Sequence, residues 1–418
     1  MKLLILICAA LGYNSFKRNK KSDFWKKISV NSIQTVFPAL TCPFQATLRT
    51  GEKPENHGII ANGFLNCEIR KSFFWEQSSN LIRTPYIWEN FQKRNGKVAQ
   101  LFMQQSLSDS DIILSPAPIH KHHGGMIQDC YSKPEDLYRK ISSLTGKKFS
   151  LSSYWGPFTS TKSSSWIASA IEFLLKEEMA DLIFAYLPHL DYDLQKHGPE
   201  SENEKRAFLF LENLIERICN SAKIAGYNIL IIGDYQIEKV NSFIQPNKIL
   251  VQDKLFSTRN INGMLYPDLF SSKAFALCDH QVALIYIFDK NVKNQVYDLF
   301  RKTDGIAEIV ELNIGNNHPD FIISSKHGKW FSYKWWNLRR EAPDYARHVD
   351  IHNKPGFDPC ELFMALFPPM SISLDDNRVK GSHGLIDGNS GQVLCASDFI
   401  EKAGDIFELT KLIKRTLG

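Results

Sequence analysis

Thr41 is the residue of this chain best placed to act as a nucleophile, because of its neighbours. It follows the apolar residues Val36 and Phe37 and lies between two prolines, Pro38 and Pro43. Proline fixes φ and has no backbone N–H, so the segment predicts a rigid turn and not a continuing strand. A threonine hydroxyl is a weak nucleophile at neutral pH until a base or a metal ion activates it. Chemistry at Thr41 therefore requires groups that the fold brings from elsewhere.

Five sequence blocks occur in order around and after this threonine. The first two read P-x-x-T-x-P and, from Thr50 to Asn62, T-G-x-x-P-x-x-H-G-I-x-x-N. The others are YLPHLDYDLQKHGP (Tyr186 to Pro199), IIGDYQ (Ile231 to Gln236) and DIHNKPGFDPCELF (Asp350 to Phe363). Together they resemble the type I phosphodiesterases/nucleotide pyrophosphatases of the alkaline phosphatase superfamily, over nearly the whole chain. The resemblance implies an α/β fold, an alkaline-phosphatase-like three-layer sandwich with a mainly parallel central sheet and a small cap subdomain.

The resemblance also implies roles for particular residues. Thr41 would attack phosphorus and form a Thr-phosphoryl intermediate, and Asn62 would hold a phosphate oxygen. Asp191, Asp234 and His352 would bind metal. Two ions about 4 Å apart stabilise the attacking and leaving oxygens in many phosphatases, and zinc takes carboxylate and imidazole ligands. The expected cofactor is therefore a divalent metal, zinc, as one or two ions.

Three of the six metal-ligand positions depart from the family pattern. The histidine expected four residues after Asp191 is Gln195, and the histidine expected after Asp234 is Tyr235. Leu11 stands where the family has a carboxylate after the first strand. These departures indicate a diverged, bacterial-type branch with altered metal ligands.

Additional residues could complete the site. Asp279 and His280 lie at an expected strand end, where α/β sheets place their sites, and His383 closes a glycine-rich turn. Gln195 can donate a hydrogen bond through its amide, and Tyr235 is a further candidate beside Asp234. Taken singly, Asp279, His280 and His383 are more often structural residues than ligands.

Two functions remain open from the sequence. The first is hydrolysis of phosphodiester or pyrophosphate bonds in a small phosphorylated or nucleotide-like substrate, through Thr41 at a metal site. The second is a diverged binder, or an enzyme of altered specificity on the same fold, that has lost part of its metal site. The motifs indicate neither the substrate nor the oligomeric state.

The bulk properties fit a globular enzyme of a reducing compartment. The net charge of +5 is too mild to indicate a nucleic-acid partner, although it suits an anionic substrate. The eight cysteines form no C-x-x-C pair, which favours buried free thiols over a zinc ribbon or a disulfide framework. No apolar stretch approaches the roughly 20 residues that span a bilayer, so no membrane partner is expected.

The first eleven residues, MKLLILICAAL, have two interpretations. Their single charge and short apolar run favour a buried strand and a cytoplasmic location over a signal peptide and export. Further along, alternating strands and helices predict a mainly parallel sheet within one domain, residues 1–418, with 238–348 as the cap. The expected strands are Leu3–Cys8, Gln34–Phe37, Gly58–Ala61, Asp111–Leu114, Leu182–Leu187, Ile229–Ile232 and Ala274–Leu277. The expected helices are Ser22–Ser29, Ile87–Asn95, Glu135–Leu144, Trp166–Glu178, Glu202–Ala225 and Gly404–Leu417.

Overall fold

The computed structural model describes residues 2–122, 125–312, 314, 318–366, 370–400 and 402–418. Its main sheet has eight strands: β1 (Leu3–Cys8), β2 (Ser29–Gln34), β5 (Val98–Leu101), β6 (Ile112–Pro116), β9 (Cys130–Lys133), β10 (Leu182–Leu187), β11 (Asn228–Gly233) and β22 (Gln392–Ser397). Their order is β2-β22-β11-β1-β10-β5-β6-β9. Among these strands, β22 and β9 run in the direction opposite to the other six. The mainly parallel α/β sheet is therefore confirmed.

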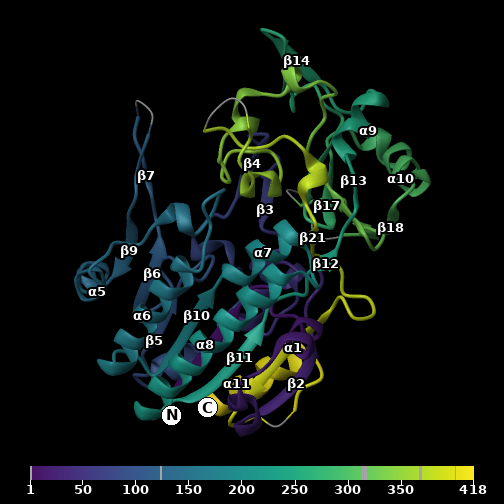
Figure 1. The fold of residues 1–418 in the computed structure, drawn as a ribbon. Coiled ribbons are helices and arrows are strands. Elements are labelled where there is room, and N and C mark those ends of the chain that lie inside the picture. Colours follow the sequence, from purple (N-terminus) through teal and green to yellow (C-terminus); the bar gives the residue numbers. More distant parts are fainter. Residues whose placement is uncertain (1, 123–124, 313, 315–317, 367–369, 401) are drawn as a thin grey trace.

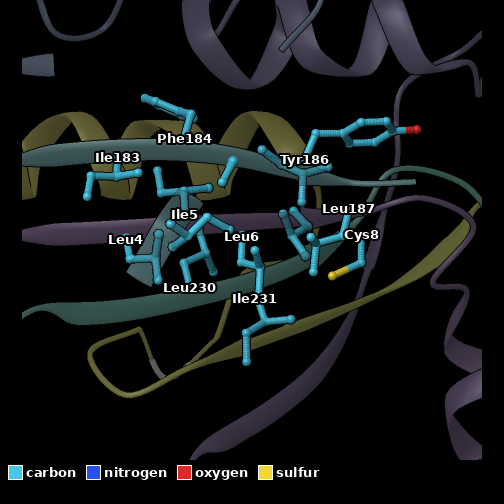
Figure 2. Packing of buried hydrophobic residues seen from close by; sticks show 14 of the residues in the cluster. Leu4, Ile5, Leu6, Cys8, Ile183, Phe184, Tyr186, Leu187, Leu230 and Ile231 are labelled. Carbon is cyan, nitrogen blue, oxygen red and sulfur yellow. The ribbon is translucent and has the colours of Figure 1, made fainter. Parts of the chain in front are cut away.

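The centre of this sheet is the strand β1. It pairs in parallel with β10 on one side and β11 on the other, so that Ile5 lies opposite both Phe184 and Leu230. Every residue of β1 is buried, and Figure 2 shows its side chains packed with those of β10 and β11. A parallel strand covered on both faces has a continuous apolar sequence, as LLILIC does. The strand expected at Leu3–Cys8 is confirmed.

Helices surround the sheet (Figure 1). α6 (Lys162–Lys176) and α8 (Glu202–Ile224) pack together over β10 and β11, while α2 (Thr41–Thr50) packs against α11 (Ile406–Leu417). No helix in these described ranges is long and apolar enough to cross a membrane. The cytoplasmic location stays a prediction. The other helices are α1 (Tyr13–Asn19), α3 (Pro54–His57), α4 (Glu89–Lys93), α5 (Leu137–Thr145), α7 (His189–His197), α9 (Pro246–Gln252) and α10 (Lys293–Lys302).

A second, antiparallel sheet lies within residues 238–348. Its strands are β16 (Ala274–Asp279), β17 (Val282–Ile287), β19 (Phe321–Ser325) and β18 (Ile306–Glu311), in that order across the sheet. They form a core of their own, which also contains Leu40 and Ile60. The segment that carries Thr41 therefore lies where this core meets the main sheet. Whether 238–348 is a cap within one domain stays a prediction.

Short two-stranded pairs complete the described strands. They are β3 (Gly63–Asn66) with β4 (Lys71–Phe74), β7 (Ile119–His120) with β8 (Met126–Ile127), β12 (Glu238–Lys239) with β21 (Gly381–Ser382), β13 (Ser242–Ile244) with β20 (Lys329–Phe331), and β14 (Thr258–Ile261) with β15 (Met264–Pro267).

Some local predictions are wrong. The helix expected at Ser22–Ser29 is only a 3-10 turn at Asp23–Lys27, because β2 begins at Ser29. The strand expected at Gly58–Ala61 does not form, since α3 ends at His57 and Gly58 takes a left-handed φ of 86°. The strand expected at Gln34–Phe37 lies earlier in the chain, since β2 ends at Gln34. The helices α1, α2, α3, α7, α9 and α10 were not expected from the sequence. Pro43 does not prevent α2, because proline is tolerated in the first helical turn.

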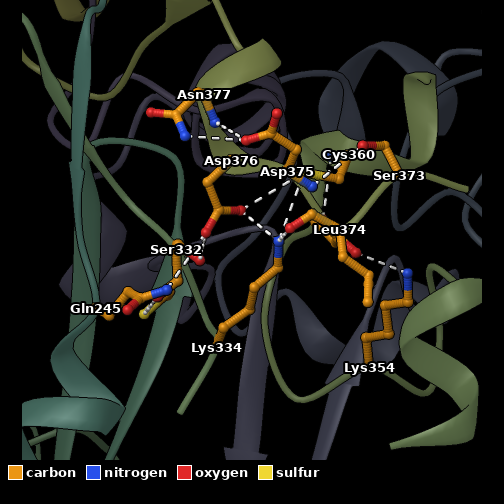
Figure 3. Close-up of polar contacts among 12 residues, drawn as sticks. Gln245, Ser332, Lys334, Lys354, Cys360, Ser373, Leu374, Asp375, Asp376 and Asn377 are labelled. Atoms are coloured by element: carbon orange, nitrogen blue, oxygen red, sulfur yellow. Dashed lines mark hydrogen bonds and ion pairs between the residues drawn. The ribbon is translucent and has the colours of Figure 1, made fainter. Parts of the chain in front are cut away.

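Two buried lysines, Lys334 and Lys354, form ion pairs that stabilise the segment after residue 330. Lys334 forms an ion pair with Asp376 and donates 2.9 Å to the Leu374 carbonyl (Figure 3). The second, Lys354, lies 2.8 Å from Asp358 and 2.7 Å from Glu361, and all three side chains are 1% exposed. Buried charges require such pairing, because leaving water is costly for each ion.

Candidate active site

A cavity of about 490 Å³ lies at the carboxyl end of the central strands. Thr41, Asp191, Gln195 and Tyr235 line it, as do three of the predicted histidines, His280, His352 and His383. Much of the remaining wall is apolar and aromatic. None of the described lining residues is a lysine or an arginine. The wall does not include Asn62, Asp234 or Asp279, which contact it through neighbouring residues.

Thr41 is the first residue of α2 and is 4% exposed. Its hydroxyl lies close to the phenols of Tyr186 and Tyr235. Burial raises the pKa of both phenols well above the ordinary value, and the nearby Thr41 hydroxyl offsets a small part of that rise. The next residue, Cys42, donates its N–H to Oδ1 of Asn62 at 3.0 Å. The N-terminus of a helix favours negative charge, so Thr41 stands where a phosphate group would be stabilised.

Asp191 receives a hydrogen bond at each of its carboxylate oxygens. It lies in the first turn of α7, directly after β10. The Tyr235 hydroxyl donates to Oδ1 at 3.0 Å, and Gln195 Nε2, one helical turn further along, donates to Oδ2 at 2.7 Å. Burial raises the pKa of Asp191 to about 7, although both hydrogen bonds act in the opposite direction. This carboxyl is therefore poised to gain or lose a proton near neutral pH.

Asp234 follows β11 and is fully buried. Its Oδ1 accepts the N–H groups of Ala10 and Tyr235, each at 2.9 Å. Its Oδ2 accepts the hydroxyl of Tyr186 at 3.4 Å. Burial raises the pKa of Asp234 well above its ordinary range. Tyr186 was missed as a site residue, although it begins the YLPHLDYDLQKHGP block and is the penultimate residue of β10.

A second chain of contacts joins Asn62 to the cavity. Asn62 donates its N–H and its Nδ2 to Asp279, at 2.8 and 3.1 Å, and Asp279 lies 2.7 Å from Nδ1 of His280. The His280 ring centroid is 3.9 Å from that of His383, whose ring stacks on Tyr235 at 3.5 Å. Burial raises the pKa of Asp279 to about 6 and lowers that of His280 to about 3. The imidazole of His280 is therefore neutral.

His352 lines the same cavity with different partners. Its Nδ1 lies 3.0 Å from the carbonyl oxygen of Phe74, and its ring lies 6.4 Å from that of His120. No hydrogen bond or ring contact found in the described ranges joins it to Thr41 or Asp191. The structure thus brings His383, and not His352, against the Asp191–Tyr235 pair.

The side chains of this site do not fit a two-ion centre. Zinc takes three or four His, Cys, Asp or Glu ligands. Among the residues with described placement, no three such side chains are arranged to hold a metal ion. The amide and phenol at the two expected histidine positions donate to Asp191. Zinc stays a prediction of the resemblance.

The family model for type I phosphodiesterase / nucleotide pyrophosphatase matches residues 22–358. The chain belongs to this family. Two yeast proteins are similar in sequence. Ectonucleotide pyrophosphatase/phosphodiesterase 1 of Saccharomyces cerevisiae is 23% identical over 334 residues, 77% of this chain and 40% of that protein. An uncharacterised pyrophosphatase/phosphodiesterase of Schizosaccharomyces pombe is 21% identical over 63% of this chain and 48% of its own length. The chain thus spans less than half of each.

Two solved structures have the same fold as this chain. Murine ectonucleotide pyrophosphatase/phosphodiesterase 5 superposes with a TM-score of 0.62 at 15% identity, covering 100% of this chain and 95% of the other. Phosphonoacetate hydrolase from Sinorhizobium meliloti 1021 superposes with a TM-score of 0.64 at 13% identity, covering 100% and 96%. The alkaline-phosphatase-like α/β architecture expected from the sequence is confirmed.

Proposed function

We propose that this chain hydrolyses a phosphodiester or pyrophosphate bond in a small, nucleotide-like substrate, with Thr41 as the nucleophile. The observation that carries this proposal is the position of Thr41 at the N-terminus of α2, beside two phenols that are each hydrogen-bonded to a buried carboxyl group. Membership of the phosphodiesterase family supports the reaction class. An inactive form of the structurally similar murine protein was solved with AMP, which supports a nucleotide-like substrate.

The first step forms a phosphoryl-threonine. The Thr41 oxygen bonds to phosphorus while the bond from phosphorus to the leaving oxygen breaks. The Thr41 proton passes to the Tyr235 oxygen as the Tyr235 proton passes to Asp191. The raised pKa of Asp191, about 7, suits a group that must accept a proton at neutral pH. The leaving oxygen takes the proton that Asp191 has gained, through Tyr235, and departs as an alcohol or a phosphate.

The second step regenerates Thr41. Water bonds to phosphorus, the bond from phosphorus to the Thr41 oxygen breaks, and this oxygen takes back a proton. For a diester, the sum is phosphodiester plus water giving phosphomonoester plus alcohol. The N-terminus of α2 stabilises the negative charge of the transferring group. No lysine or arginine of the described wall assists, so we expect slow turnover.

A specific observation favours a second function, which is binding without turnover. Gln195 and Tyr235 both donate to Asp191, where the family pattern has metal-binding histidines. The apolar wall includes Trp155, Phe357 and Ile372 and can hold a flat or apolar group by burial alone. Such a site needs Thr41 only as a hydrogen-bonding group.

Trapping the intermediate distinguishes these functions. The full chain is incubated with bis(p-nitrophenyl) phosphate, quenched in acid and digested, and the Thr41 peptide is examined by mass spectrometry. Hydrolysis predicts a peptide that carries one p-nitrophenyl phosphate group on residue 41 in the wild type and in Thr41→Ser, and no such peptide in Thr41→Ala. Saturable quenching of tryptophan fluorescence by the diester, with neither product nor modified peptide, would instead support binding alone.

A further inference from the structure

The two carboxyl groups hydrogen-bonded to Tyr186 and Tyr235 also accept other donors of the chain itself. Asp191 accepts from Tyr235 and Gln195, and Asp234 accepts from two backbone N–H groups and from Tyr186. All these donors are buried. An ion at Asp191 would meet an amide and a phenol where the family pattern has two histidines, and neither group is a usual zinc ligand.

Two tyrosines stand between Thr41 and these carboxyl groups. The hydroxyl of Tyr186 is hydrogen-bonded to Asp234 and that of Tyr235 to Asp191, and both phenols lie close to the Thr41 hydroxyl. In two-metal phosphatases, the ions link the attacking oxygen to the carboxylates that hold them. The phenols form that link here. A hydroxyl both accepts and donates, so one phenol can serve both partners at once.

Two of the imidazoles of the cavity are held through Nδ1. His383 lies flat on Tyr235, with 1° between the ring planes, and its Nδ1 is 2.7 Å from the carbonyl oxygen of Ala39. His280 forms a hydrogen bond through Nδ1 with Asp279. Among the described residues, neither ring belongs to a group of three His, Cys, Asp or Glu side chains that could hold an ion.

We propose that this site is metal-free in the working protein, and that the hydroxyls of Tyr186 and Tyr235 hold Thr41 to the carboxyl groups in place of ions. The proposal rests on the proposed function for the reaction that the site performs. The part of the proposal that concerns metal binding does not depend on which reaction the site performs.

Metal content gives the first test. The full chain is purified without chelator and analysed by plasma mass spectrometry, and hydrolysis of bis(p-nitrophenyl) phosphate is measured with and without EDTA. We expect far less than one zinc, manganese or iron per chain and no loss of activity in EDTA. Zinc on the exposed His122, which does not line the cavity, is controlled by the variant His122→Ala. A stoichiometric ion that persists in this variant overturns the proposal.

Restoring the ligands gives the second test. Gln195→His/Tyr235→His places two imidazoles beside Asp191, so we expect a gain of one tight zinc site per chain in a titration against a competing chelator. Gln195→His alone is the fallback if the double variant does not fold, and Gln195→Leu/Tyr235→Phe is the matched control. A folded double variant that binds no more zinc than this control would show that these two residues do not exclude the ion.

The two proposals can fail separately. A metal-free chain without hydrolysis leaves this inference standing and removes the proposed hydrolysis. A chain with a stoichiometric ion in the cavity and a p-nitrophenyl phosphate group on Thr41 removes this inference and leaves the hydrolysis.

Discussion

The hydroxyl of Tyr235 lies 3.0 Å from Oδ1 of Asp191, and the two residues are 44 positions apart in the chain. Tyr235 follows the end of β11, and Asp191 lies in the helix that follows β10. These two strands flank β1, so their carboxyl ends reach the same edge of the sheet. The phenol of Tyr235 also lies close to the Thr41 hydroxyl, and its ring stacks on that of His383. Tyr235 therefore lies between the nucleophile candidate Thr41, the carboxyl group of Asp191 and the imidazole of His383.

Removing a phenolic hydroxyl should slow the reaction without unfolding the chain. We expect Tyr235→Phe to lower kcat for bis(p-nitrophenyl) phosphate about 10²-fold, since a positioned proton-transfer group contributes about 10²–10⁴-fold. Tyr186→Phe should have a smaller effect because its bond to Asp234 is longer, 3.4 Å. Steady-state kinetics measures both. Tyr154→Phe, on the wall of the same cavity, is the control, and an equal loss there would contradict a specific role for Tyr235.

The rate should depend on pH through Asp191. Its pKa is raised to about 7, and only the ionised form accepts a proton, so kcat should fall as the pH drops from about 8 to 6. Asp191→Asn cannot ionise and should give a low rate with no inflection in this range. A pH–rate profile for both proteins tests this. An unchanged inflection in Asp191→Asn would assign it to another group.

Asn62 should matter for both stability and catalysis. It accepts from the Cys42 N–H and donates twice to Asp279. Asn62→Ala removes the two side-chain bonds and leaves buried groups unpaired, which costs about 1–3 kcal/mol for each. Urea denaturation should show that loss, together with a reduced kcat. The exposed Asn56, changed to Ala, is the control and should alter neither quantity.

The buried ion triad should be important for stability alone. Lys354→Met leaves Asp358 and Glu361 without their cation, and breaking a buried pair in this way costs about 3–5 kcal/mol. Lys290→Met breaks an exposed pair with Asp320 and should cost less than about 1 kcal/mol. Urea denaturation of the two variants measures the difference. Equal losses would mean that Lys354 is not buried as described.

The sequence predicted the central strands well because burial determines their composition. Both Leu3–Cys8 and Leu182–Leu187 are uninterrupted apolar runs between polar residues, and both strands have those bounds. The segment at Thr41 was harder, since its two prolines favoured a turn. A helix begins there because the packing of α2 against α11, more than 350 residues later, outweighs that local preference.

The contacts of the site were less predictable than its members. Asp191, Asp234 and Tyr235 could be named from short motifs, and the structure joins all three through Tyr235. Spacing along the chain could not decide which of His352 and His383 meets them, because that depends on how distant loops return to the sheet. Tyr186 carried no signal of its own, as a tyrosine in a buried strand is usually a packing residue.

The N–H of Ala10, two residues after β1, donates to Asp234, so folding itself supplies a partner to that carboxyl group. Under the metal-free proposal, the chain would mature without a trace element. Its specific activity would be the same from zinc-starved cells as from replete ones, and the cell would have no step of cofactor loading at which to regulate it.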